Sequence, residues 1–232
     1  MKQMTMKNKK LSRRLSYIIS FVGEPKGIID VGCDHGLVCA SLSKNRKVKK
    51  LYLNDISEKC LEKARANVKE FGDMSKCTFN CAFGLSGFRK MKVDTCLIAG
   101  MGGEEIVKIL ENKPAYLKIK NLCLQPATKM IYLKRWLAEN NFKLIKDEFF
   151  LSEHVFYNIF KVRKGKNRLD DVQLIFGKNN LKHPSEEFRS YITENLEKLN
   201  LYAKGGASER LLDEIKLFEQ AERRIKINER RN

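Results

Sequence analysis

The amino-acid sequence predicts an α/β protein with a doubly wound, mostly parallel sheet and a C-terminal helical coiled-coil hairpin. Short apolar runs typical of strands alternate with segments of helical period over the first two thirds of the chain. A glycine-rich turn follows the first of these runs. Beyond residue 164 the strand patterns stop and amphipathic helical patterns follow. We therefore expect one domain over 1–164 and a helical coiled-coil domain over 165–232.

The individual strands and helices follow from apolar period and from capping residues. The apolar runs predict strands over 27–31, 50–53, 77–82, 94–99 and 121–125, followed by an antiparallel pair over 143–151 and 155–162. A helix is expected from about Leu37, and Ser57 and Thr128 are candidate N-caps of later helices. Glu104 and Glu105 stand where a helix N-terminus favours acidic side chains. Such alternation is typical of a doubly wound sheet.

The C-terminal segment predicts two amphipathic helices. His183-Pro184-Ser185 marks the start of the first helix, because proline is favoured in the first turn and serine is a good cap. Gly205-Gly206 interrupts the pattern, and a second helix is expected from Ser208 to about Glu229. Two such helices joined by a glycine turn form a coiled-coil-like hairpin.

Composition bounds the cellular setting. No apolar run approaches the roughly 18 residues of a transmembrane helix, and no signal peptide is evident. The seven cysteines are odd in number and form no C-x-x-C pair, which favours reduced thiols over a disulfide framework. Only three histidines occur, and they lie far apart, so no metal site is expected. We therefore expect a cytoplasmic protein without metal or membrane.

The positive charge is concentrated before the helical tail. The net charge is +18, with 31 basic and 16 acidic residues in 1–163 against 15 and 12 in 164–232. Near the N-terminus the basic residues are Lys2, Lys7, Lys9, Lys10, Arg13 and Arg14. A field of this sign attracts phosphate backbones. Nucleic acid is the expected partner, although simple solubility charge would look similar.

The turn after the first predicted strand indicates the cofactor class. Residues 30–36 read Asp-Val-Gly-Cys-Asp-His-Gly, so Asp34 stands where a dinucleotide-binding loop carries its middle glycine. A carboxylate there repels a pyrophosphate, whereas it favours the ammonium and sulfonium of S-adenosylmethionine. We predict an S-adenosylmethionine site and a methyltransferase, with Asp30, Gly32, Cys33 and Gly36 as the cofactor frame.

The ends of the second and third predicted strands extend this site. Asp55 is placed to accept hydrogen bonds from ribose hydroxyls, as acids do at this position of nucleotide-binding folds. An ordinary aspartate at a helix entrance is the alternative. The cofactor adenine is expected near Ala82 and Phe83. Phe83 could equally be a core residue.

The fourth and fifth strand ends supply the remaining candidates. Three glycines within 99–103 at the carboxyl edge of a parallel sheet suggest a site, because α/β sites form at this edge. No Asn/Asp-Pro-Pro-aromatic motif follows, which counts against methylation of an exocyclic amine. Gln125 and Pro126 could line a pocket or merely end the strand. We expect cofactor contacts from Gly100 and Met101, and substrate contacts from Gly102, Gly103, Gln125 and Pro126.

With these motifs assembled, the chain resembles the bacterial TrmK family of tRNA adenine-22 N1-methyltransferases. The resemblance rests on the segments 11–15, 30–36, 99–103 and 124–126, on Trp136-Leu137 and on Tyr157, and it covers nearly the whole chain. It implies a class I methyltransferase domain followed by a coiled-coil domain, acting on tRNA with S-adenosylmethionine. Phe83 departs from the family, where a small polar residue is usual.

The implied reaction needs positioning more than a strong base. Adenine N1 is a neutral nucleophile at pH 7, and the base must be exposed or flipped to reach the methyl group. Asp34 is the candidate to stabilise developing positive charge, and His35 to orient the base or help release a proton. His35 could instead brace the loop. Arg13 and Arg14 are expected to hold phosphates, or Arg13 to close over the cofactor.

Other functions remain open on the sequence alone. A nicotinamide-dependent oxidoreductase is disfavoured by Asp34, and a non-catalytic RNA-binding protein by the intact segment 99–103. A methyltransferase acting on another RNA or on a small molecule is the nearer alternative, and the basic charge argues against the small molecule. No obligate protein partner is evident.

Overall fold

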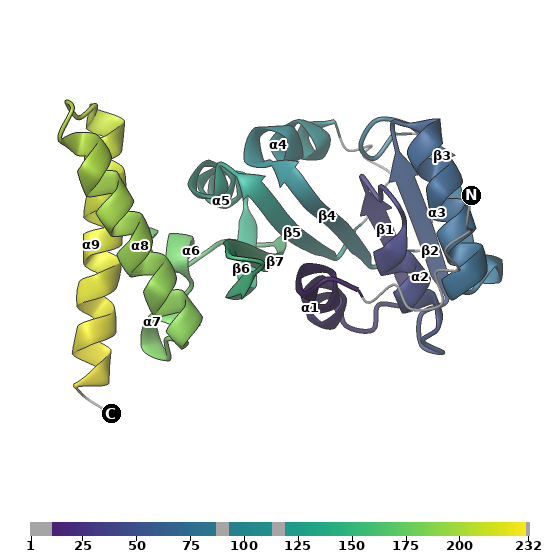
Figure 1. Ribbon diagram of the computed structural model, residues 1–232, viewed down its shortest axis with the longest axis horizontal. Helices are drawn as coiled ribbons and strands as arrows, with labels where there is room; N and C mark the ends of the chain where they lie inside the picture. Colours follow the sequence, from purple (N-terminus) through teal and green to yellow (C-terminus); the bar gives the residue numbers. More distant parts are fainter. Residues whose placement is uncertain (1–10, 87–92, 113–118, 231–232) are drawn as a thin grey trace, which may run out of the picture. The chain divides into compact units, whose positions relative to one another are not determined.

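The computed structural model of the chain describes residues 11–86, 93–112 and 119–230 (Figure 1). The described residues fall into two compact units. The first contains those up to Leu97 together with Asn112, and the second contains Ile98–Glu111 and those from Ile119 onward. Four of the basic residues expected to attract phosphates lie outside the described residues: Lys2, Lys7, Lys9 and Lys10.

The first unit alternates helices and strands in the predicted order. Its elements are α1 (Arg13–Val22), β1 (Gly27–Val31), α2 (Leu37–Ser43), β2 (Lys50–Asp55), α3 (Glu58–Phe71), the short 3-10 helix η1 (Met74–Lys76) and β3 (Cys77–Cys81). The strand β4 (Thr95–Gly102) begins in this unit and ends in the second. The expected helix start is confirmed at Ser57, whose hydroxyl accepts the N–H of Cys60.

The second unit holds the rest of the sheet and the helical tail. Its elements are α4 (Gly103–Glu111), β5 (Asn121–Thr128), α5 (Met130–Glu139), β6 (Phe142–Ser152), β7 (Val155–Lys164), α6 (Asp171–Phe176), α7 (Lys178–Lys182), α8 (Glu186–Ala203) and α9 (Glu209–Glu229). The strands form a seven-stranded sheet in the order β3-β2-β1-β4-β5-β7-β6. Pairing is parallel between β1, β2 and β3, and antiparallel between β5, β7 and β6. The predicted doubly wound sheet is confirmed.

Two predicted boundaries at the carboxyl edge were wrong. The strand expected over 121–125 continues to Thr128, and the strand expected over 94–99 continues to Gly102. Thr128 is not the cap of the next helix. Lys129 is the cap residue instead, with a left-handed φ of 58° and no side-chain cap bond. A threonine in extended conformation suits a strand end, so local capping preference did not decide the boundary.

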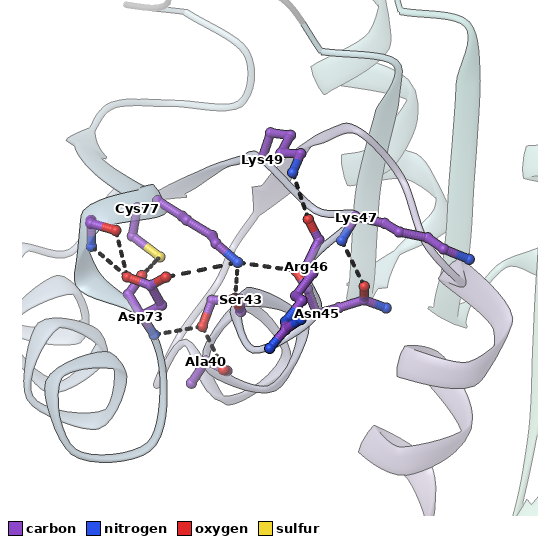
Figure 2. A network of polar contacts seen from close by, with 10 residues as sticks. Ala40, Ser43, Asn45, Arg46, Lys47, Lys49, Asp73 and Cys77 are labelled. Carbon is purple, nitrogen blue, oxygen red and sulfur yellow. Dashed lines mark hydrogen bonds and ion pairs between the residues drawn. The ribbon is translucent and has the colours of Figure 1, made fainter.

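A polar network fastens the end of α2 in the first unit (Figure 2). The Ser43 hydroxyl donates to the carbonyl of Ala40 and accepts the N–H of Asp73, both at 2.8 Å. The Lys76 ammonium donates to the carbonyls of Ser43 at 2.6 Å and Asn45 at 3.0 Å. These bonds satisfy carbonyl groups that a helix C-terminus leaves unpaired. They hold the C-terminal end of α2 in place. The glycine-rich turn lies at the other end of this helix, so the turn leads into a fixed helix.

The tail of the second unit is a helical hairpin with its own apolar core. Figure 1 shows α8 and α9 lying side by side. The predicted cap is confirmed at Ser185, which accepts the N–H of Phe188, and the second helix begins near Ser208, which accepts the N–H of Leu211. The buried core is formed by the four helices α6, α7, α8 and α9 together with Phe149 of β6. Its helical residues are Val172, Ile175, Phe176, Leu181, Phe188, Ile192, Leu217, Phe218, Ala221 and Ile225. The hairpin is therefore packed on the sheet of its own unit.

A buried ion pair lies beneath this core. The Lys134 ammonium of α5 donates to Asp147 Oδ2 and to the carbonyl of Ile175, both at 2.6 Å. The other oxygen of Asp147 accepts the amide N–H of Asn158 at 2.6 Å. Lys134 and Asp147 are 2% and 8% exposed. Burial lowers the pKa of Lys134 and raises that of Asp147, while each charge favours the ionised form of the other.

Candidate functional site

The turn between β1 and α2 is tight and backbone-rich. Gly32, Asp34 and Gly36 all have left-handed φ values, of 69°, 46° and 64°. The N–H groups of Gly32 and Cys33 both donate to the carbonyl of Asn54, at 2.8 and 3.1 Å. A Cβ on Gly36 would lie 2.8 Å from the Cβ of Ala64, so glycine is required there by packing as well as by φ. Asp34 adopts a left-handed φ although it is not glycine. Such residues are uncommon in proteins, and they cluster at functional sites.

Asp55 joins the ends of β1 and β2. Its Oδ2 accepts the backbone N–H of Asp34 at 3.0 Å, and its Oδ1 accepts that of Ser57 at 3.0 Å. A carboxylate oxygen has two acceptor positions, so each oxygen can still receive one more donor. Asp55 therefore braces the turn, and it also retains the capacity to accept a hydroxyl.

Asp30 is a buried acid with a perturbed pKa. It is 4% exposed at the end of β1, and the thiol of Cys39 donates to its Oδ2 at 3.5 Å. Burial raises the pKa of Asp30 to about 7; the Cys39 thiol lowers it and the nearby Asp55 raises it further. Burial also raises the pKa of the Cys33 thiol, so Cys33 contacts its surroundings as a neutral group. A carboxyl of this kind is stabilised in its ionised form by an incoming cation.

The state of Asp30 makes stability depend on pH. Its folded-state pKa of about 7 exceeds the ordinary 3.8, so between these values the folded chain holds a proton that the unfolded chain has released. The contribution of Asp30 to the free energy of unfolding therefore falls as pH rises from about 4 to 7, by at most about 1.4 kcal/mol per pH unit. We expect Asp30→Asn to remove this pH dependence. Urea unfolding of both proteins at pH 5 and pH 7.5 checks this, and parallel losses in the two proteins would contradict it.

Asp34 and His35 lie together at the surface of the turn. His35 Nε2 lies 3.5 Å from Asp34 Oδ1 and 3.4 Å from the ammonium of Lys63. The His35 backbone carbonyl accepts the side-chain amide of Asn67 at 2.8 Å. The Asp34 side chain is 68% exposed and that of His35 is 38% exposed. Asp34 can therefore face a ligand, whereas His35 has neighbours on two sides.

The turn after β3 is positioned by Asn54, a residue that sequence reasoning missed. Asn54 is fully buried, and its amide donates to the carbonyls of Ala82 at 2.9 Å and Gly84 at 2.7 Å. Its oxygen accepts the amide of Asn80 at 2.6 Å. Phe83, between the two bonded carbonyls, is 46% exposed, so it is not a core residue. The signal for Asn54 was an amide next to Asp55 within an otherwise apolar strand.

The carboxyl edge of the second unit is crowded at its glycines. Gly100 has a φ of 80°. A Cβ on Gly103 would lie 2.5 Å from the carbonyl oxygen of Lys129, and one on Gly102 would lie 3.3 Å from Thr128 Oγ1. Packing between the β4–α4 and β5–α5 junctions therefore explains Gly103 without a ligand. Met101, between these glycines, is half-buried.

The remaining candidates differ in exposure. Gln125 is fully buried and its amide donates to the carbonyl of Pro126 at 2.9 Å. Pro126 lies within β5 and is also buried, so it does not end the strand. Arg13 and Arg14 occupy the first two positions of α1, after the Ser12 cap, with Arg13 exposed. Two arginines at a helix N-terminus create a local field that attracts anions.

Two absences hold for the described residues. Over 11–86, 93–112 and 119–230, no cluster of three or more histidine, cysteine or acidic side chains has the geometry to hold a metal ion. Over the same ranges no helix is long and apolar enough to cross a bilayer.

Comparison with known proteins defines the class. Residues 11–160 match the methyltransferase domain family, and the chain therefore belongs to that family. The tRNA (adenine(22)-N(1))-methyltransferase of Bacillus subtilis is 30% identical over 149 residues, which cover 64% of this chain and 62% of the relative.

Solved structures narrow the class further. A candidate tRNA (m1A22) methyltransferase of Streptococcus pneumoniae, in complex with S-adenosyl-L-methionine, has a TM-score of 0.81 at 28% identity and covers 92% of this chain and 100% of its own. The fold is also that of M. capricolum TrmK, with a TM-score of 0.81 at 23% identity, covering 93% and 99% of the two chains. Within the methyltransferases this chain is similar to these tRNA (m1A22) methyltransferases, in line with the resemblance of its sequence motifs to the TrmK family.

Proposed function

We propose that this protein transfers a methyl group from S-adenosylmethionine to N1 of adenine 22 in tRNA. The observation that carries the proposal is the turn 30–36, which places the Asp34 carboxylate where a dinucleotide site needs glycine, in a chain of the methyltransferase family. The B. subtilis relative carries this activity in its name, and the S. pneumoniae structure holds this cofactor. The substrate points to action in the cytoplasm.

The residues of the first unit fit the cofactor. When bound, S-adenosylmethionine supplies an electrophilic methyl group on a sulfonium. Asp30, with its raised pKa, is suited to a cationic ligand, and the tight turn that contains Gly32, Cys33 and Gly36 follows it directly. Asp55 keeps acceptor capacity for ribose hydroxyls. We also assign adenine contacts to Ala82 and Phe83, and further cofactor contacts to Gly100 and Met101.

Asp34 and His35 carry the chemistry in this proposal. Adenine N1 needs no strong base, so the protein acts by holding the base in line with the methyl group. The exposed Asp34 carboxylate favours the positive charge that develops on the base. His35, held between Asp34 and Lys63, orients that carboxylate.

The RNA is assigned to a separate set of residues. Arg13 and Arg14 hold phosphates at the start of α1. The substrate contacts at the carboxyl edge are assigned to Gly102, Gly103, Gln125 and Pro126. Gln125 and Pro126 act through the backbone they position, since both side chains are buried. Residues 1–164 form the methyltransferase domain in this proposal, and 165–232 a helical domain that helps grip the tRNA.

Transfer of labelled methyl groups tests the proposed function. Unmodified tRNA carrying adenine at position 22 should accept label from S-adenosylmethionine, whereas the same transcript with guanine at that position should not. Equal labelling of both transcripts, or labelling of neither, would overturn the proposal. A binding titration with NADH in place of S-adenosylmethionine tests the oxidoreductase alternative. If NADH does not bind, that alternative is excluded.

Asp34→Ala separates chemistry from binding. We expect turnover to fall roughly a hundredfold, about 2.7 kcal/mol in the barrier, because a preorganised charge facing the reacting base is lost. Binding of tRNA should change less than threefold. Single-turnover rates and filter binding measure the two effects, with Glu62→Ala on α3 as an exposed-acid control. Full activity of Asp34→Ala removes Asp34 from the chemistry.

A further inference from the structure

A large cleft lies within the second unit, between the end of β5 and the helical hairpin. Its volume is about 980 Å³, and its walls come from α4, α5, β7, α8 and α9. Trp136, the only tryptophan of the chain, lies in its wall. The volume is that of a small-molecule site.

The cleft is acidic on a strongly basic protein. Five carboxylates line it, on three separate helices: Glu104, Glu139, Glu209, Asp213 and Glu214. Only three basic residues face them, and one of these, Arg135, is already paired with Asp171 at 2.8 Å. In the part of the chain that the structure describes, Glu139, Glu209 and Glu214 form no ion pair. A cation is attracted to such a surface.

A second, independent feature points to a ligand with donor groups. Asn158, in the wall of the cleft on β7, is 7% exposed. Its amide nitrogen donates to Asp147 Oδ1 and to the carbonyl of Glu148, at 2.6 and 3.1 Å. Its amide oxygen has no hydrogen-bond partner. A buried acceptor without a donor is costly, and a bound N–H group removes that cost.

The remaining walls are aromatic. Tyr132, Trp136, Phe156 and Tyr191 line the cleft, and Tyr132 is 43% exposed. Aromatic faces attract ammonium groups and also cover methylene chains. The carboxylates do not converge on one point, since the described residues hold no cluster able to bind a metal ion. A ligand with positive charges spaced along an apolar chain matches this arrangement better than a single ion.

We propose that the cleft binds a linear aliphatic polyamine. Its ammonium groups pair with the dispersed carboxylates, one N–H reaches the Asn158 oxygen, and its methylene groups lie along the aromatic walls. This binding requires neither the cofactor nor RNA, so it can be measured with the enzyme alone.

The position of Trp136 gives a direct test with the enzyme alone. Titration with spermidine at constant ionic strength should change the tryptophan fluorescence in a saturable way, with matching heat in calorimetry. The double variant Glu209→Gln/Glu214→Gln should weaken the affinity at least fivefold. The matched control Glu197→Gln/Glu194→Gln removes two exposed carboxylates of α8 that do not line the cleft, and should leave the affinity unchanged.

Three outcomes would overturn the proposal. The first is no saturable signal in either fluorescence or calorimetry. The second is an equal response to magnesium chloride at the same ionic strength, which would indicate screening alone. The third is equal weakening by the cleft variant and by the α8 control. Circular dichroism confirms that both variants are folded, so that a loss of binding reports on the cleft.

Discussion

Asp55→Ala is expected to weaken binding of S-adenosylmethionine by roughly tenfold to a hundredfold. The Asp55 carboxylate accepts the backbone N–H groups of Asp34 and Ser57, both at 3.0 Å. A hydrogen bond to a charged group contributes about 1.5–3 kcal/mol, and each 1.4 kcal/mol is tenfold in affinity. The variant loses the brace of the turn and the proposed ribose contact together. Isothermal calorimetry measures the change.

The control for this experiment is another carboxylate of the same unit. Glu24 accepts hydrogen bonds from Lys47 and Asn45 but lies near the amino end of β1, away from the turn. Glu24→Ala should therefore leave the affinity unchanged. If Asp55→Ala binds the cofactor as tightly as Glu24→Ala does, Asp55 does not belong to the cofactor site.

Lys134→Met is expected to lower the free energy of unfolding by about 3–5 kcal/mol. The substitution leaves the Asp147 carboxylate buried beneath the hairpin core without its counter-charge, which is the costly way to break a buried ion pair. It also removes the donor to the Ile175 carbonyl of α6. The midpoint of urea unfolding measures the loss.

A neighbouring pair provides the comparison. Arg135 of α5 pairs with Asp171 at 2.8 Å, but both side chains are nearly half exposed. Arg135→Met should therefore cost at most about 1 kcal/mol. The double variant Lys134→Met/Asp147→Leu should recover much of the lost stability, because no charge then stays buried. Similar losses for Lys134→Met and Arg135→Met would show that burial of the first pair does not matter.

Local patterns predicted most of the sheet and the helical hairpin. Strands such as β1 and the β6–β7 pair have apolar patterns that match their burial, and Ser57 and Ser185 cap helices as expected. The short helices α6 and α7 were missed, because six and five residues carry too little period to detect. The Lys134–Asp147 pair was also missed, because burial of two charges depends on contacts between distant segments.

The sequence predicted the backbone conformation of the candidate site better than the burial and contacts of its side chains. The glycines at 32 and 36 have the left-handed φ values that a tight turn requires. The pKa of Asp30 depends on burial that sequence does not reveal. Asn54 orders the turn around Phe83 through two carbonyls, and nothing in a single sequence shows that long-range role. Gly103 stays a proposed substrate contact, and close packing against Lys129, which a single sequence does not reveal, also requires glycine there.

The position and chemistry of the transferred methyl group test the central claim most directly. Unmodified tRNA would be incubated with the enzyme and S-adenosylmethionine, digested to nucleosides and oligonucleotides, and analysed by mass spectrometry against N1- and N6-methyladenosine standards. We predict N1-methyladenosine at position 22 and nowhere else in the tRNA. N6-methyladenosine, or a methyl group on another nucleotide, would contradict the account.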